Sequence, residues 1–248
     1  MKVVIVGGVA GGATAAARLR RLDEQAEIIV IERSHYVSYA NCGLPYYLGG
    51  TITDRNKLTL QTPQSFKERF NIEVRVDQEV THIHRDDKLV EIHNLATDET
   101  YTESYDKLIL SPGAHPVIPD LPGITSSRIF TLRTVEDTFA IADFMDENHP
   151  TSATIVGGGF IGLEMAENLV EKGLSVTVIQ RPNHLMPTLD PDIASLLHNT
   201  FREHGVTVKL SADVIGFEQD TSNKGQTAIT THIKDDTFAP TSDFVVLA

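Results

Sequence analysis

The chain has 248 residues, 41% of them hydrophobic, which suffices for one or two domains with sizeable cores. Its formal net charge of -13 opposes non-specific binding to nucleic acid and to anionic membranes. The single cysteine, Cys42, excludes an intramolecular disulfide and a cysteine-rich metal site, and no apolar run reaches the roughly 18 residues of a membrane-spanning helix. No signal peptide precedes the first apolar segment, so we expect a soluble, cytoplasmic protein.

The N-terminal part begins as a strand, a glycine-rich turn and a helix over residues 3–22, VVIVGGVAGGATAAARLRRL, followed by a second strand over 26–33. A short helix is predicted over 62–70, because Thr62 suits the N-cap position and Pro63 the first helical position. Four β-rich runs then predict a small antiparallel meander: 72–76, 79–84, 88–93 and 100–105.

The same pattern returns about 150 residues later. After a buried strand with an extended link over 106–123 and an amphipathic helix over 134–148, a strand, glycine-rich turn and helix occupy 152–173, and a strand occupies 174–181. A further helix is predicted over 190–205, with strands at 206–210, 213–220, 227–234 and 243–248. The repeat predicts an α/β fold with two Rossmann-like, three-layer units in tandem, each with a small antiparallel β meander.

Each glycine-rich turn fits a dinucleotide-binding loop, because it follows an apolar strand and opens a helix. Glycines there permit a tight turn and the close approach of a pyrophosphate, and the helix N-terminus attracts the phosphates. The second loop carries the complete set, Gly157, Gly159 and Gly162. The first loop has Gly7, Gly8, Gly11 and Gly12, but Val9 stands at the middle position and leaves the pyrophosphate less room. A glycine-rich turn without a ligand is the alternative for each loop.

The residue that ends the second strand of such a unit contacts the ribose. In the first unit this residue is Glu32, whose carboxylate can accept from both ribose hydroxyls. In the second unit it is Gln180, followed by Arg181. A glutamine neither selects nor repels a 2′-phosphate, and Arg181 can accept one, so we expect the second unit to accommodate both NADH and NADPH.

Cys42 lies in the segment SYANCGLPYYLGG, residues 38–50. Gly43 and Pro45 predict a helix that begins just after the cysteine, and a helix N-terminus stabilises a thiolate. Because the chain has no second cysteine, a redox cycle at Cys42 must use an external sulfur or a sulfenic acid. An inert, buried cysteine is the alternative.

Two nucleotide units with a cysteine after the first resemble the FAD- and NAD(P)H-dependent pyridine nucleotide-disulfide oxidoreductases. The motifs GGVAGGATAAARLRRLD, SYANCGLPYYLGG, YDKLILSPGA and FTLRTVEDT are similar to the single-cysteine branch of that family, and Val9 in the first loop is part of the pattern of this branch. The branch contains coenzyme A-disulfide reductases, CoA persulfide reductases, and NADH oxidases and peroxidases. The resemblance covers essentially all 248 residues. It implies FAD and NAD(P)H as cofactors and coenzyme A as substrate or mixed-disulfide partner.

The resemblance also implies roles for individual residues, with Cys42 as the catalytic one. The cofactor-binding positions are Gly7, Gly8, Ala10, Gly11, Gly12, Glu32, Arg33, Val80, Ser111, Gly113, Arg133, Gly157, Gly159, Phe160, Ile161, Gly162, Glu164, Gln180 and Arg181. The CoA-contacting positions are Thr14, Arg18, Arg21, Ser38 and Asn41. Arg18 replaces a glutamine of the family, and a lysine contact of the family falls on Phe70.

Two clusters of side chains also allow an interpretation in which they bind no ligand. Arg18 and Arg21 are three residues apart and share one helix face, which provides a basic patch for polyanionic CoA but equally describes a solvated face. His82 and His84 share one face of a predicted strand, and without a third ligand nearby in the sequence we expect no metal site there.

We therefore predict an FAD-binding domain over 1–115, a connecting segment with a helix over 116–149 and an NAD(P)H-binding domain over 150–248. Hydride passes from NAD(P)H to FAD, and the electrons then reach Cys42, which attacks a CoA disulfide or persulfide and holds a mixed disulfide with CoA. The alternatives are an NADH oxidase or peroxidase with a Cys42 sulfenic acid, and an inactive nucleotide-binding fragment.

Members of the resembled family continue past the point that corresponds to residue 248, with the remainder of the FAD site and a C-terminal domain through which they form homodimers. From that resemblance we expect the present chain to lack the dimerisation domain, to bind FAD weakly or not at all, and to lack full turnover.

Overall fold

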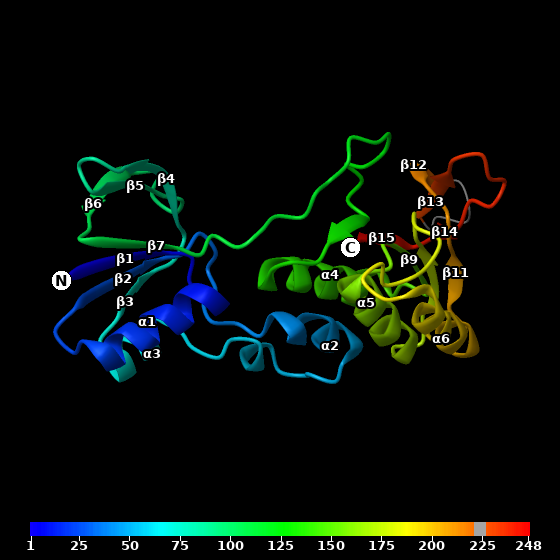
Figure 1. Cartoon of the computed structure of the whole chain (residues 1–248). Coiled ribbons are helices and arrows are strands. Elements are labelled where there is room, and N and C mark those ends of the chain that lie inside the picture. The colour runs from blue at the N-terminus through cyan, green and yellow to red at the C-terminus, as the bar shows by residue number, and fades with distance from the viewer. Residues whose placement is uncertain (221–226) are drawn as a thin grey trace. The chain divides into compact units, whose positions relative to one another are not determined.

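The computed structural model describes residues 1–220 and 227–248. Contacts within the chain divide it into two compact units (Figure 1). Unit 1 consists of Met1–Ala40 and Arg55–Ala114, and unit 2 consists of Asn41–Asp54 and His115–Ala248. The segment that carries Cys42 therefore groups with the unit of the second nucleotide loop. The domain boundaries predicted from the sequence divide the chain by the cofactor that each part binds. They stay a prediction.

Unit 1 is built on a four-stranded parallel sheet in the order β3-β2-β1-β7. The strands are β1 (Lys2–Val6), β2 (Glu27–Ile31), β3 (Glu73–Arg75) and β7 (Lys107–Leu110). Strands β1 and β2 are almost continuously apolar because both faces of the sheet are covered. The predicted strand at 72–76 was wrongly assigned to the meander, because its backbone pairs in parallel with β2 instead.

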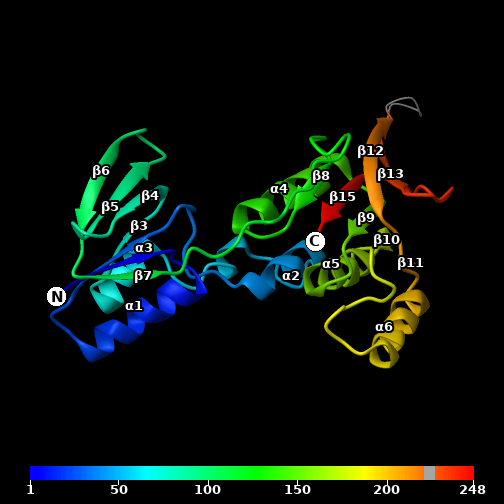
Figure 2. The same ribbon diagram turned by 45° about the horizontal axis from the view of Figure 1, so that its top comes forward.

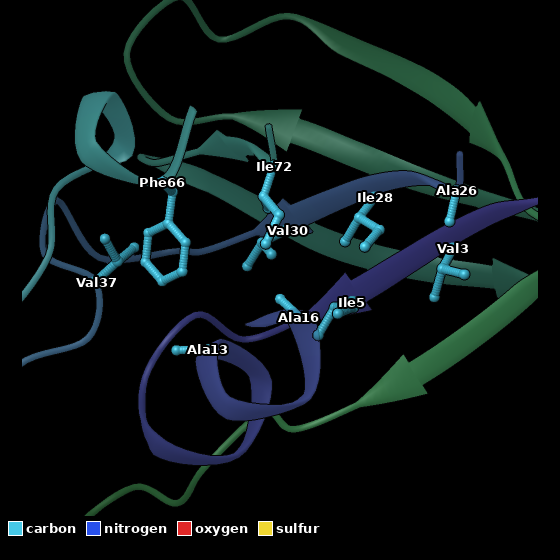
Figure 3. Close-up of a cluster of buried hydrophobic side chains, with 10 residues drawn as sticks. All are labelled: Val3, Ile5, Ala13, Ala16, Ala26, Ile28, Val30, Val37, Phe66 and Ile72. Carbon is cyan, nitrogen blue, oxygen red and sulfur yellow. The ribbon is translucent and has the colours of Figure 1, made fainter. Parts of the chain in front are cut away.

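One face of this sheet is covered by helices and the other by the meander. Helices α1 (Ala10–Leu22) and α3 (Pro63–Phe70) pack on Val3, Ile5, Ile28 and Val30, with the ring of Phe66 inserted between the elements (Figure 3). The intervening residues of the same strands point to the opposite face, where they meet the apolar side chains of the meander. The meander is antiparallel and consists of β4 (Gln78–His84), β5 (Leu89–Asn94) and β6 (Thr100–Ser104).

Unit 2 repeats this plan with an additional edge strand. Its parallel sheet has the order β11-β10-β9-β15-β8. These strands are β8 (Ile129–Thr131), β9 (Ser152–Val156), β10 (Ser175–Ile179), β11 (Thr207–Lys209) and β15 (Phe244–Leu247). A second antiparallel meander consists of β12 (Val214–Asp220), β13 (Ala228–Ile233) and β14 (Thr241–Ser242), of which Figure 2 labels β12 and β13. It packs on one face of the sheet, where Phe217 and Ile229 of the meander meet Val245 of β15. Two Rossmann-like, three-layer units with meanders are thereby confirmed.

Four helices complete unit 2: α2 (Leu44–Gly49), α4 (Val135–Asn148), α5 (Phe160–Glu171) and α6 (Pro191–Glu203). Helix α4 begins at a capping box, in which the Thr134 hydroxyl accepts from the Asp137 N–H and the Asp137 carboxylate accepts from the Thr134 N–H. Thr62 caps α3 in the same way, with Ser65 as its partner, which confirms the predicted helix start. No helix in the described ranges has the length and apolar character needed to cross a bilayer.

Asp243 ties the start of β15 to the start of β9. One of its carboxylate oxygens accepts from the backbone N–H groups of Thr151 and Ser152, at 2.7 and 3.0 Å, and from both of their hydroxyls. Burial raises the pKa of Asp243, but these hydrogen bonds to the charged form outweigh burial and hold the pKa below its ordinary value of 3.8. The ionised carboxylate therefore stabilises the folded state.

We predict that Asp243→Asn lowers the free energy of unfolding by about 1 to 2 kcal/mol at neutral pH, because an amide cannot accept from all four donors. Because the folded-state pKa is depressed, the contribution of Asp243 is present above its unfolded pKa and is lost as pH falls through the folded pKa. Urea unfolding followed by circular dichroism should show the difference between parent and variant shrinking in acid. An equal difference at all pH values would contradict this account.

Candidate functional site

The first glycine loop is closed by its own backbone. Gly7 follows β1 with φ +94°, and a Cβ at this position would lie 2.0 Å from the Ser111 carbonyl oxygen. A Cβ on Gly12, in the first turn of α1, would lie 1.8 Å from the Gly7 carbonyl oxygen. Only glycine fits at both positions, so the turn brings the N-terminus of α1 directly against the end of β1. The predicted positions Ala10 and Gly11 form the start of that helix.

Glu32, at the end of β2, holds the loop from the side. One carboxylate oxygen accepts from the Gly8 N–H at 2.6 Å and the other accepts from the Ser34 N–H at 2.9 Å. Glu32 is 9% exposed, so its negative charge sits buried beside the glycine loop. The structure thus places Glu32 where the sequence predicts a ribose-binding carboxylate, with two of its lone pairs already used within the protein.

The second loop has the same construction. Gly157 has φ +120°, and a Cβ on Gly162 would lie 2.1 Å from the Gly157 carbonyl oxygen. Gln180, at the end of β10, takes the place of Glu32: its Oε1 accepts from the Gly158 N–H at 2.8 Å, and its Nε2 donates to the His184 carbonyl at 3.3 Å. Gln180 is 6% exposed, and its two hydrogen bonds hold the loop in place. The neighbouring Arg181 is exposed.

The mouth of the second loop is open. A Cβ on Gly159 would meet no atom within 4 Å, so a ligand phosphate has room at this position. Phe160 and Ile161, the first residues of α5, are 68% and 38% exposed. Glu164 lies one turn further, where burial, followed by the nearby Glu167, raises the pKa of its carboxyl. The five predicted positions from 159 to 164 therefore form one continuous helix N-terminus.

The remaining predicted cofactor positions are more scattered. In unit 1, Ser111 follows β7, with its hydroxyl beside Gly11, and Gly113 is two residues further. Val80 lies on β4, and Arg33 pairs with Glu79 at 3.6 Å. In unit 2, the backbone N–H of Arg133 donates to Asp137 in the α4 capping box. Ser111 thus lies against the first glycine loop, and the cofactor contacts of all five positions stay a prediction.

In each unit the segment that follows the second strand returns to the glycine loop and hydrogen-bonds to it. The sequence motifs did not predict these returning segments. The Ser38 N–H donates to the Gly8 carbonyl at 2.9 Å, and the Met186 N–H donates to the Gly158 carbonyl at 2.7 Å. Both residues have left-handed backbones, with φ of 46° and 49°. Ser38 was predicted as a CoA contact, which stays a prediction, and the structure adds this role for its backbone. Met186 carries no motif that would have revealed it.

In unit 2 the returning segment is anchored to α6 by His198. The Leu185 N–H donates to His198 Nε2 at 2.9 Å, so this nitrogen must be unprotonated. Burial, then the charges of Arg202 and His184, lowers the pKa of His198 below its ordinary value of 6.5. The neutral imidazole that the hydrogen bond requires is therefore the form that the surroundings favour.

Cys42 is exposed and lies in the 3-10 turn Asn41–Gly43, directly before α2. The predicted helix start after the cysteine is confirmed, with Gly43 as the N-cap and Pro45 in the first turn. Helix α2 packs on α4 and α5: the rings of Tyr47 and Phe139 meet edge to face at 5.7 Å, and Gly49 abuts Asn168. The exposed thiol, on the turn before a helix that is fixed on two sides, is accessible to a sulfur compound from solution.

The predicted CoA contacts are divided between the two units. Thr14, Arg18 and Arg21 are exposed on one face of α1 in unit 1, and within the described residues the two arginines form no ion pair. Arg20, in contrast, is committed to the fold, because its guanidinium donates to the carbonyl groups of four residues: Phe70, Asn71, Asp23 and Glu24. Asn41 lies beside Cys42 in unit 2.

The two histidines of β4 share a face, with ring centroids 4.7 Å apart. Among the residues that the structure describes, no group of three histidine, cysteine or acidic side chains is placed to hold a metal ion. The rings of His82 and His84 are accounted for by their contact with each other.

We predict that the segment 181–189 is better protected at about pH 7.5 than at about pH 5, because protonation of His198 removes the acceptor for Leu185. The folded-state pKa of His198 is lowered, so its contribution is present above the ordinary pKa and is lost as pH falls. The protection factor of the Leu185 amide, measured by hydrogen exchange, reports this loss. His198→Ala should lower the protection at both pH values and abolish the difference. Equal protection of the parent chain at both pH values would contradict the anchor.

Comparisons with known proteins show the family of the chain. The model of the family described as pyridine nucleotide-disulphide oxidoreductase matches residues 1–247. A coenzyme A disulfide reductase from Staphylococcus haemolyticus is 40% identical over 214 residues, which cover 86% of this chain and 48% of that protein. The chain thus spans about half the length of the curated relatives it matches.

Solved structures give the same result. The crystal structure of reduced Bacillus anthracis CoADR-RHD matches all of this chain and 43% of its own, with 46% identity and a TM-score of 0.92. An NAD-dependent persulfide reductase from A. fulgidus matches all of this chain and 45% of its own, with 35% identity and a TM-score of 0.92. A water-forming NADH oxidase from Lactobacillus brevis, at 29% identity, covers all of this chain and 53% of its own with a TM-score of 0.91. On the strength of the full-length family match, the two glycine loops and the fold, the chain belongs to the pyridine nucleotide-disulphide oxidoreductase family.

Proposed function

We propose that the chain carries the nucleotide-binding loops and the sulfur nucleophile of an FAD- and NAD(P)H-dependent reductase of CoA disulfide or CoA persulfide. The observation that carries this proposal is Cys42: the only cysteine in the sequence is exposed, on a turn before a helix, in a family whose members here include CoA disulfide and persulfide reductases. A sulfur partner for Cys42 must therefore come from outside the chain.

The glycine loops fit dinucleotides. The first turns of α1 and α5 present backbone N–H groups that have no intrahelical partner, and these attract a pyrophosphate. Glu32 of unit 1 suits the ribose of FAD, and Gln180 with Arg181 of unit 2 suits NADH and NADPH alike. Bound FAD supplies the acceptor for the hydride of NAD(P)H and the reductant for the cysteine sulfur. Phe160 and Glu164 are proposed to contact the nicotinamide end of the cofactor.

The sulfur chemistry at Cys42 is thiol–disulfide exchange. The Cys42 thiolate attacks one sulfur of a CoA disulfide, so that a Cys42–CoA disulfide forms and one CoA thiolate leaves. With a CoA persulfide, attack on the CoA sulfur forms the same mixed disulfide and expels hydrosulfide. Two electrons from NAD(P)H, delivered through the flavin, and protons then break the mixed disulfide and release CoA, which restores the Cys42 thiolate.

The basic face of α1 suits the phosphates of CoA. Arg18 and Arg21 are exposed, one helical turn apart, and form no ion pair among the described residues, so both guanidinium groups are available to an anion. Arginine binds phosphate through parallel N–H groups. In a chain with a net charge of -13, such a patch offers a local attraction that the whole molecule does not. Thr14, Ser38 and Asn41 are proposed as further polar contacts.

A first experiment tests the partner of Cys42. Incubation with CoA disulfide should add one CoA per chain by intact mass, a reductant should remove it, and Cys42→Ser should show no adduct. Arg18→Ala with Arg21→Ala should slow the addition by about tenfold, or about 1.4 kcal/mol, and high salt should slow the parent chain in the same way. The matched control is glutathione disulfide, whose reaction should not respond to the two arginine substitutions. A chain that forms only a sulfenic acid with peroxide, and no CoA adduct, would favour the NADH oxidase chemistry.

A second experiment tests the loop of unit 2. Gly162→Ala should weaken NADH binding by at least about tenfold, because its Cβ would lie 2.1 Å from the Gly157 carbonyl oxygen. The control is Gly216→Ala, also in unit 2, whose Cβ meets its nearest neighbour at an ordinary 3.4 Å. Titration calorimetry with NADH and NADPH measures both variants. If Gly162→Ala binds as tightly as the parent, NAD(P)H does not use this loop.

A further inference from the structure

Helix α2, which follows Cys42, packs tightly against α5 at Gly49. A Cβ at Gly49 would lie 2.2 Å from Asn168 Oδ1 and 2.9 Å from Asn168 Cβ. No side chain fits at this position without displacement of one helix. The contact lies at the C-terminal end of α2, whereas Cys42 precedes the N-terminal end of this six-residue helix. A shift at Gly49 is therefore carried to Cys42 over roughly 9 Å of helix.

Asn168 is an unusual residue for this position. It is 1% exposed, and its Nδ2 donates to the Glu164 carbonyl at 2.8 Å, one turn earlier in α5. Its Oδ1 is buried and accepts no hydrogen bond from the residues that the structure describes. A buried acceptor without a donor carries a cost in folding stability. An apolar side chain of similar size would avoid this cost, so the cost needs an explanation outside the stability of α5 itself.

The back-bond to Glu164 offers that explanation. It holds the Asn168 side chain in one orientation and directs Oδ1 at Gly49, where only Cα hydrogens are available. The side of α2 is held separately by the Tyr47–Phe139 contact with α4. Rotation and spacing of the short helix are thus set by two different neighbours.

We propose that Gly49 and Asn168 form a seat that positions α2, and with it the Cys42 sulfur, on α5. Asn168 is a positioning residue: it touches neither the sulfur nor a cofactor and acts through Gly49. Its importance for catalysis rests on the proposed function of Cys42. The seat itself is a property of the chain and can be tested without flavin, nicotinamide or CoA.

The charges on α5 provide a readout for the position of Cys42. Glu164, Glu167 and Glu171 are spaced three and four residues apart, so they share one face of α5. They raise the pKa of the Tyr46 phenol, Glu167 most, and Cys42 itself contributes to the same shift. Tyr46 thus lies within electrostatic range of both the carboxylates and the cysteine. The negative field of these carboxylates repels an anionic reagent that approaches a correctly placed Cys42, and it leaves the approach of a neutral reagent largely unchanged.

The experiment compares alkylation of Cys42 by neutral iodoacetamide and by anionic iodoacetate. The quantity measured is the rate with iodoacetamide divided by the rate with iodoacetate. This ratio is independent of the thiolate fraction of Cys42, because both reagents react with the same thiolate. In the folded parent chain at low ionic strength the ratio should exceed that of the urea-unfolded chain at the same ionic strength by about threefold, and added salt should reduce the excess. Gly49→Ala should move the ratio at least halfway to the unfolded value, because α2 is pushed off its seat.

Rescue separates positioning from general destabilisation. Asn168→Gly alone loosens the seat and should shift the ratio in the same direction. The double variant Gly49→Ala with Asn168→Gly should restore the parent ratio, because the added methyl occupies the vacated space, although a helical glycine lowers the stability of α5. Asn168→Ala should rescue less, since Cβ to Cβ would still be 2.9 Å. Gly216→Ala, with an ordinary contact at 3.4 Å, should leave the ratio unchanged.

Two results overturn the proposal: a parent ratio that Gly49→Ala and Asn168→Gly both leave unchanged, or a double variant no closer to the parent than its two single variants. Should Gly49→Ala not fold, Asn168→Gly alone still decides between the outcomes, because it introduces no clash. A failure of CoA to add to Cys42 would refute the proposed function and leave these ratios as they are.

Discussion

The backbone of Gly8, with its counterpart at Gly158, is the constraint on which each nucleotide loop depends. Its N–H donates to the side chain that ends the second strand, Glu32 or Gln180, and its carbonyl accepts from the backbone N–H of Ser38 or Met186. Both backbone polar groups of this glycine are thus satisfied within the protein. The turn stays closed without a ligand, and the N–H groups that begin α1 and α5 remain directed outward. A loop arranged in advance binds a pyrophosphate without first being ordered.

The two units differ in the side chain that holds the glycine loop and in the element that follows the returning segment. Unit 1 holds its loop with a carboxylate, Glu32, and unit 2 does so with an amide, Gln180. The returning segment of unit 1 leads directly into the cysteine turn, whereas that of unit 2 leads into α6 and is anchored there by His198. The same construction therefore leads into Cys42 after the first loop and into an imidazole anchor after the second.

The cysteine turn gains its surroundings from the unit to which it does not belong in sequence. Residues 41–54 are inserted between parts of unit 1, yet they pack with the helices of unit 2. Helix α2 has only six residues and is too short to be stable alone, so its position is set by α4 and α5. The acidic face of α5 consequently becomes part of the environment of Cys42, and the tight contact at Gly49 decides how closely the two approach.

Local signals in the sequence determined much of this protein: the apolar strands, the caps at Thr62 and Thr134, both glycine loops and the helix start after Cys42 are dictated by side chains within a few residues of each other. Pairing and packing over long distances were decided only in the tertiary structure. The run at 72–76 has the composition of a meander strand, but it joins β2 because the edge of the parallel sheet offers it a partner. Met186, His198 and Asn168 lie in no motif that indicates their roles, and the backbone role of Ser38 is not part of its motif either. These roles arise from backbone and side-chain atoms that become neighbours only when distant segments meet. The sequence shows that Cys42 has no second cysteine with which to pair. The residues that surround Cys42 are determined by the tertiary structure, because its segment packs with the helices of unit 2.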